Sequence, residues 1–162
     1  MMLIFLIMAK LILKSPEEFK KLIGNNLGKS DWKLVDQKKI NIFAEATEDF
    51  QWIHVDNEKA KNESPLKNTI AHGYLSLSLI PKFIDEIWEC QNLKLILNYG
   101  SDKIRFISPV ICNNYIRANV SVIDAKDYKG GILLKSKVEI EIKNNDKLAV
   151  SAETLSLLYS LN

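Results

Sequence analysis

The predicted fold and function both depend on two short sequences, DFQWIH at residues 49–54 and IAHG at residues 70–73. The first places a carboxylate (Asp49) and an imidazole (His54) five residues apart, in what we predict to be irregular chain between two helical segments. The second places Gly73 at the start of a long apolar helix, where free backbone N–H groups can face a ligand. An acid–base pair beside such donors is typical of chemistry next to a carbonyl group.

A long helix is predicted directly after Gly73, because apolar residues there follow helical spacing. Its apolar positions are Leu75, Leu79, Ile80, Phe83, Ile84, Ile87 and Trp88. They occupy nearly every side of its first half, which is typical of a helix buried on most faces. Pro81 lies inside this pattern and is expected to kink the helix or disturb its hydrogen-bond ladder.

Helix-start signals come before the first of the two sequences. Asp36 is a predicted N-cap for a helix that leads to Asp49, and the short apolar segment before it, residues 32–35, is a predicted strand. Asp56 is a predicted N-cap for a third short helix, over residues 57–61. Nearer the N-terminus, SPEE at residues 15–18 predicts a helix with an N-cap serine, a proline at its first position and a capping box.

The second half of the chain is rich in β-forming residues. Turn sequences at residues 127–131 and 144–146 separate predicted strands at residues 93–108, 110–123, 132–142 and 148–159. Val138, Ile140 and Ile142 alternate with charged residues, so one strand face is expected to be buried. Four long antiparallel strands, one early strand and one buried helix predict an α+β fold, a curved sheet wrapped around a helix.

Length and composition favour a single domain without metals or disulfides. The 162 residues are enough for a hydrophobic core, and 22 Lys and Arg against 20 Asp and Glu give no electrostatic signature of nucleic-acid binding. Cys90 and Cys112 are isolated from each other and from histidine, so we expect reduced thiols in a cytoplasmic protein and no metal site.

The first residues form an apolar run, residues 1–7, with no charge before it. This run is far shorter than the about 20 residues that a membrane helix needs, and it makes a poor signal peptide, so no membrane association is expected. We predict a start near Met8, a non-essential extension over residues 1–14, and a single domain over residues 15–162.

Each candidate residue also has an ordinary structural explanation. His54 could be a half-buried, hydrogen-bonded residue, and Asp49 a turn former. His72 could cap or pack at the helix entrance, and Gly73 could allow two backbones to approach closely. Asp49 and His54 together, with Trp52 beside them to exclude water, favour a functional site.

Three motifs resemble those of a known family. DFQWIH followed by Ala60 resembles the signature of R-specific enoyl-CoA hydratases and MaoC-like dehydratases. IAHG resembles that family's helix-opening motif, and RFISPV at residues 105–110 resembles its strand motif. The pair Gln51-Trp52, which stands where many relatives have Asn-Pro, is similar to the branch related to the nodulation N protein, and so is NYG at residues 98–100.

The resemblance implies a hot-dog fold, a long central helix wrapped by an antiparallel sheet, in homodimers whose sheets join. It implies that Asp49 and His54 are the catalytic pair that holds the reacting water, and that the Gly73 N–H is the oxyanion donor. It implies no cofactor. The substrate-binding residues that we expect are Gln51, Trp52, His72, Asn98 and Tyr99.

The expected reaction is hydration of a trans-2-enoyl-CoA to the R-3-hydroxyacyl-CoA, or the reverse dehydration, on CoA or an acyl carrier protein. Asp49 is favoured as the base and His54 as the proton donor, although coupled groups need not have separable roles. A hot-dog thioesterase is one alternative, but its acidic residue would be expected on the central helix, which has no carboxylate before Asp85. A non-catalytic acyl-binding protein is the other.

Overall fold

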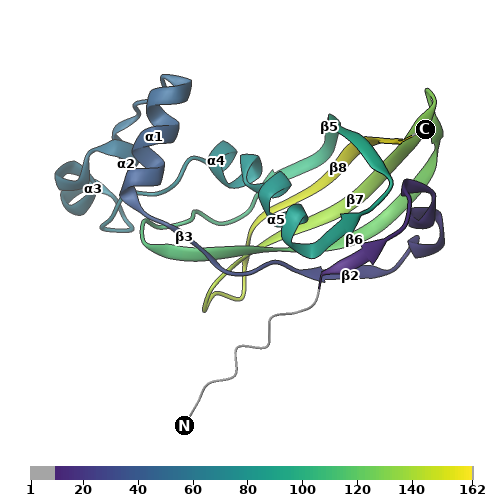
Figure 1. The fold of residues 1–162 in the computed structure, drawn as a ribbon. Helices are drawn as coiled ribbons and strands as arrows, with labels where there is room; N and C mark the ends of the chain where they lie inside the picture. The colour runs from purple at the N-terminus through teal and green to yellow at the C-terminus, as the bar shows by residue number, and fades with distance from the viewer. Residues whose placement is uncertain (1–9, 162) are drawn as a thin grey trace, which may run out of the picture.

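A curved antiparallel sheet of six strands forms the body of the structure, a computed structural model that describes residues 10–161 (Figure 1). Five strands follow the order β2-β6-β7-β8-β5, and β3 also pairs with β6. The strand bounds are β2 Asn26–Lys29, β3 Lys33–Val35, β5 Leu93–Phe106, β6 Asn114–Tyr128, β7 Gly131–Ile142 and β8 Leu148–Ser160. The four long strands and the turns between them confirm the predicted β-rich half.

One face of the long strands makes the core. Val138, Ile140 and Ile142 on β7 are at most 2% exposed, and Val120 on β6 pairs with Val138 in register. The alternating residues on the other face carry charges, as in the ion pair between Lys29 and Glu141. The sheet is therefore apolar on the face that the helices cover, as its period-two pattern predicts.

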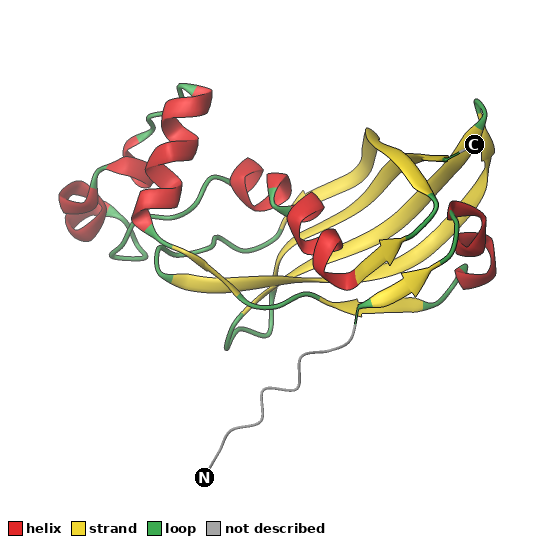
Figure 2. Ribbon diagram, in the orientation of Figure 1, coloured by secondary structure: helices red, strands yellow, loops and turns green. Residues whose placement is uncertain are grey.

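The predicted central helix is present in two pieces, α4 (Gly73–Ser78) and α5 (Ile80–Ile87), which lie against the concave face of the sheet (Figure 2). Pro81 sits in the first turn of α5, so the expected interruption is confirmed. Phe83 from α5 is fully buried. Trp88 was expected on the helix but begins β4 (Trp88–Cys90), whose partner is the parallel strand β1 (Leu11–Leu13).

Three helices form a layer at one end of the sheet, α1 (Gln37–Thr47), α2 (Trp52–Val55) and α3 (Asn57–Glu63) (Figure 1). Both predicted caps are confirmed, because the side chains of Asp36 and Asp56 each accept a hydrogen bond of 2.9 Å from the third residue after them. The predicted irregular chain around His54 is wrong, since His54 lies within the single turn of α2.

The first predicted helix is a 3₁₀ helix, η1 (Pro16–Leu22), without the predicted capping box. The Ser15 side chain makes no capping bond, and the Glu18 carboxylate accepts from the Lys14 backbone N–H at 2.7 Å. This acceptor role replaces the reciprocal bond to Ser15 that a capping box requires. The predicted start near Met8 and the apolar run before it lie outside the described residues.

The sheet wrapped around α4 and α5 confirms the predicted α+β hot-dog fold. Cys90 and Cys112 are buried free thiols. Among the described residues, no helix has both the length and the apolar character required to cross a membrane.

Candidate active site

The segment of residues 70–72 is bonded on both sides and brings the two motifs together. The Ile70 N–H donates to the Ile53 carbonyl at 3.0 Å, and the His54 ring nitrogen Nδ1 lies 2.7 Å from the Ile70 carbonyl. On the other side, the Ala71 N–H donates to the Val110 carbonyl at 2.8 Å. The helical layer is therefore tied to the entrance of the central helix.

The environment of His54 favours a neutral imidazole with a defined tautomer. A carbonyl oxygen can only accept, so the bond to Ile70 places a proton on Nδ1 and leaves a lone pair on Nε2 of the neutral ring. The side chain is buried, and this burial lowers the pKa of His54. The bond to the Ile70 carbonyl and the nearby Asp49 carboxylate oppose that shift, while His72 adds to it.

Asp49 follows the end of α1, where Glu48 has the left-handed backbone conformation, with φ of 59°. Its side chain is about half exposed, at 53%. One Asp49 carboxylate oxygen and one ring nitrogen from each of His54 and His72 all lie within 4.8 Å of one another. The structure therefore brings the predicted acid–base pair within reach of a single water molecule.

His72, the residue before α4, is 3% exposed and packs between aromatic rings. Its ring stacks on that of His54, with centroids 3.8 Å apart, and contacts the Phe43 ring at 5.1 Å. Its Nε2 lies 3.0 Å from the Asp49 carbonyl oxygen and 3.9 Å from the Asp49 carboxylate. The burial of this ring leaves it little surface for direct contact with a substrate.

The same three residues have the ligand types of a metal centre, but their hydrogen bonds do not fit one. The bond to the Asp49 carbonyl places a proton on Nε2 of His72, the nitrogen that lies 3.9 Å from the Asp49 carboxylate. A protonated nitrogen has no lone pair for a metal ion. The arrangement fits proton transfer better than metal ligation.

A pocket of about 240 Å³ lies beside these residues. His54 and Gly73 both line it, so the residue that carries the imidazole and the first residue of α4 border the same space. Because Gly73 is the first residue of α4, its N–H has no acceptor within that helix. The remaining lining residues are Ile70, Ala71, Ser76, Phe106, Ile107, Ser108, Pro109, Val110, Ala149 and Val150.

An aromatic side chain approaches Gly73 closely. A Cβ added at Gly73 would lie 2.8 Å from Cδ1 of Phe106, shorter than real contacts. The close approach that the sequence allowed for therefore involves a side chain and not a second backbone. Phe106 and the buried Ser76 line the pocket, and the sequence motifs marked neither as a site residue.

Two further hollows continue along the seam between α4–α5 and strands β5 and β8. The first, of about 450 Å³, is lined by Asn98 and Tyr99 from β5 and by Thr154 from β8, among others. The second, of about 370 Å³, shares Pro81, Ile84, Asn98 and Ser156 with the first. The predicted substrate residues Asn98 and Tyr99 therefore lie farther along the helix than the His54 pocket.

The other two predicted substrate residues lie at the start of α2. Gln51 is its exposed N-cap residue, and the Trp52 ring has the Lys59 ammonium 5.1 Å from its centroid. Neither lines the His54 pocket. Gln37, which the sequence motifs did not mark, donates to the His54 carbonyl at 2.8 Å and so supports the turn that carries the imidazole.

The family model for the MaoC like domain matches residues 18–144 of this chain. The chain belongs to the MaoC-like family. This confirms the resemblance drawn from the motifs at residues 49–54, 70–73 and 105–110.

Two curated relatives and one solved structure are similar to most of this chain. The chain is 37% identical over 133 residues to 3-hydroxyacyl-thioester dehydratase Z of Mycobacterium tuberculosis, covering 82% of this chain and 87% of that protein. It is 39% identical over 139 residues to nodulation protein N of Rhizobium leguminosarum, covering 84% and 86%. The structure of R-hydratase PhaJ1 from Pseudomonas aeruginosa matches with a TM-score of 0.69 at 19% identity, covering 85% and 82%, and shows the same fold.

The site geometry predicts an unusual titration for His54. The chain has two histidines, so both can be followed by NMR as the pH changes. We expect the His54 pKa to lie below its usual value of about 6.5, because burial disfavours the imidazolium form. Because the unfolded chain protonates His54 more readily than the folded protein does, the free energy of unfolding should fall as the pH drops from about 6.5 through the folded-state pKa.

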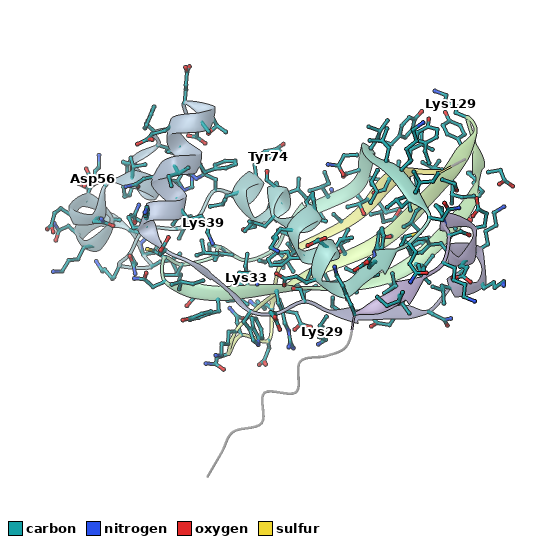
Figure 3. All side chains as sticks on the ribbon, in the orientation of Figure 1. Lys29, Lys33, Lys39, Asp56, Tyr74 and Lys129 are labelled. Atoms are coloured by element: carbon teal, nitrogen blue, oxygen red, sulfur yellow. The ribbon has the colours of Figure 1, made fainter. Side chains whose placement is uncertain are left out.

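In Asp49→Asn the His54 pKa should fall further, because the carboxylate that favours the imidazolium is gone. Asp56→Asn is the matched control, since Asn also caps helices and the Asp56 side chain, at the outer end of the helical layer in Figure 3, accepts from the Lys59 N–H. A His54 pKa at its usual value, or one unchanged in Asp49→Asn, would contradict this description of the site.

Proposed function

We propose that this protein adds water to a trans-2-enoyl thioester to give the R-3-hydroxyacyl thioester, or catalyses the reverse dehydration. The observation that carries the proposal is that His54 and Gly73 line one small pocket, while a carboxylate oxygen of Asp49 lies within 4.8 Å of a ring nitrogen of His54. The names of the dehydratase and R-hydratase relatives support it. The acyl carrier is coenzyme A or an acyl carrier protein.

In the hydration direction, the water lies between the Asp49 carboxylate and Nε2 of His54. His54 accepts one proton from the water while the water oxygen forms a bond to the β-carbon of the enoyl group. The thioester oxygen becomes an enolate oxygen, and the Gly73 N–H donates to it. The proton on His54 then passes to the α-carbon, which leaves the imidazole neutral and returns the thioester carbonyl.

This assignment reverses the roles favoured by the sequence alone, in which Asp49 was the base. The lone pair on Nε2 and the lowered pKa of His54 support the imidazole as the proton acceptor near neutral pH. Asp49 then orients the water by accepting its second O–H. The dehydration uses the same groups in the opposite order.

The acyl chain extends from the pocket along the seam lined by α4, α5, β5 and β8. The two hollows beyond the His54 pocket provide about 450 Å³ and about 370 Å³ of space. Asn98 and Tyr99 line the first of them and would contact the chain there, as expected for substrate-binding residues. Gln51 and Trp52, at the start of α2, do not line the His54 pocket. We place them at the entrance through which the substrate reaches it.

A thioesterase is the main alternative reaction on the same substrate class. Its acidic residue would be expected on the central helix, but α4 and α5 have no carboxylate before Asp85. Asp85 is largely exposed and lies within 4 Å of Lys10 and Lys82, so its carboxylate is paired at the surface.

One assay separates the possible activities. In this assay, purified protein is incubated with crotonyl-CoA and with longer enoyl-CoA substrates. Loss of enoyl absorbance without free thiol supports the hydratase. Thiol release supports the thioesterase, and binding without either change supports an acyl-binding protein.

Removing either member of the pair should slow this hydration strongly. We expect Asp49→Asn and His54→Asn each to lower kcat by a factor of about 10² to 10⁴, the usual contribution of a positioned acid or base. Circular dichroism should show an unchanged fold. Asp56→Asn, which alters a carboxylate that caps α3, should retain wild-type turnover. Full activity in Asp49→Asn would overturn the assignment.

Gly73→Ala should impair turnover by displacing the Phe106 ring from the pocket wall. A shift of about 1 Å in such a site can cost about 10²-fold in rate. The loss from Gly73→Ala should be smaller when Phe106→Ala is already present, because the clash is then removed. Equal losses in the two backgrounds would show that the contact with Phe106 is not the reason for a glycine at this position.

We also propose that the protein is a homodimer that joins two sheets along β5. This 14-residue strand pairs only with β8 in the described sheet and has an open edge. Its exposed apolar residues are Leu95, Ile96, Leu97, Tyr99 and Phe106. A long apolar edge strand is a template for pairing with another chain, and a second copy of β5 would cover it.

Light scattering of the purified protein should therefore give about twice the chain mass of 18.5 kDa. Leu97→Lys places a charge on the β5 edge and should shift the mass toward that of one chain. Ile123→Lys is the matched control, because Ile123 is also exposed but lies on β6, which β7 and β8 separate from β5. A wild-type mass of one chain would contradict the dimer.

A further inference from the structure

His72 has contacts that neither substrate binding nor helix capping explains. It precedes α4 and makes no side-chain capping bond to that helix. At 3% exposure it also has almost no surface to offer a substrate. Its ring instead lies against the two residues that carry the proposed chemistry, Asp49 and His54.

The hydrogen bond of His72 is made to the backbone of Asp49. The carbonyl oxygen of Asp49 lies 3.0 Å from Nε2, and a carbonyl can only accept, so Nε2 is the donor. The other nitrogen, Nδ1, is buried and has no hydrogen-bond partner among the described residues. The ring is therefore oriented by its single bond to Asp49 and by its stacking.

This bond fixes a segment that has few other supports. Asp49 and its two neighbours, Glu48 and Phe50, are exposed, and the Asp49 carboxylate accepts only a long bond of 3.4 Å from the Gln51 N–H. Without the His72 donor, the backbone of Asp49 would have more freedom to move. A carboxylate that must hold a water at one position needs such a support.

The second contact of His72 fixes the plane of the His54 imidazole. The rings are stacked, with centroids 3.8 Å apart and planes 27° apart, and the bond from Nδ1 of His54 to the Ile70 carbonyl fixes the remaining rotation. The ionisable groups that face His54 are Asp49, from the segment after α1, and His72, from the segment before α4. A positive charge on either stacked ring opposes a charge on the other.

We infer that His72 is a positioning residue that holds both members of the catalytic pair, Asp49 through its carbonyl and His54 through the stacked ring. The inference rests on the proposed function for the identity of the pair. It assigns His72 a role different from the substrate contact expected from the sequence, and it gives a physical reason for histidine at this position. Only a ring with an N–H donor makes both contacts at once.

Two variants separate the contacts. His72→Gln keeps an N–H donor that can reach the Asp49 carbonyl but removes the stacked ring, whereas His72→Phe keeps a ring but removes the donor. Both should lower kcat/KM for enoyl-CoA hydration, with about 10²-fold for His72→Phe, because Asp49 loses its support. In both, the His54 pKa should rise, because a chargeable neighbour is gone, and the acid limb of the pH–rate profile should move upward with it.

Phe43→Leu is the control for packing alone, because it alters a ring that packs on His72 and leaves the hydrogen bond to Asp49 and the stack with His54 in place. It should change thermal stability without moving the His54 pKa or the acid limb. Wild-type turnover with an unchanged His54 pKa in folded His72→Gln and His72→Phe would overturn the inference. The inference would also be overturned if the His54 pKa rose as much in Phe43→Leu as in the two His72 variants.

A measurement on the unaltered protein tests the inference even if the variants fail to fold. Nitrogen-15 NMR shifts distinguish the two tautomers of each neutral histidine. We expect the proton on Nε2 of His72 and on Nδ1 of His54. The opposite tautomer of His72 would remove the bond to Asp49 and overturn the inference. Because these NMR readouts need no turnover, failure of the proposed reaction would be distinguished from failure of the positioning role.

Discussion

The hydrogen bonds of residues 70–72 are the constraint on which the rest of the site depends. This segment accepts from the His54 ring, donates to Ile53, and on its far side donates to Val110 next to the sheet. Three separate parts of the chain are thereby held at one point, namely the helical layer, the entrance to the central helix and the connection between β5 and β6. Because buried backbone groups must be paired, the segment cannot move without breaking bonds on both sides.

The central helix begins directly after residues 70–72, and its burial against the sheet fixes the position of its first residue. Leu75 and Phe83 anchor α4 and α5 in the concave face of the sheet, so the position of Gly73 is set by the core. The break at Pro81 divides the helix without disturbing its first turn, where the Gly73 N–H lies. The proposed oxyanion donor therefore lies at the start of the helix, and the main apolar anchor lies beyond the break.

Local signals predicted the parts of the fold that depend on neighbours in sequence. The caps at Asp36 and Asp56 and the buried face of β7 each rest on contacts within a few residues or on a simple period. The parts that were missed depend on distant partners. Trp88 leaves the helix because β4 pairs with β1, where its partner is Leu11 near the start of the described chain. The burial of His72 and the contact of Phe106 with Gly73 likewise arise only when the sheet and the helical layer meet.

The two members of the proposed acid–base pair occupy opposite environments, and this difference supports the different roles that we propose for them. The Asp49 side chain is half exposed, whereas His54 is buried and one of its ring nitrogens donates to a carbonyl oxygen. A half-exposed carboxylate can accept a hydrogen bond from a water molecule and so orient it. A buried neutral imidazole keeps one free lone pair and can take up a proton and release it again near neutral pH. The motif places the two residues five positions apart in the sequence, and the burial of only one of them supports the division of roles that we propose.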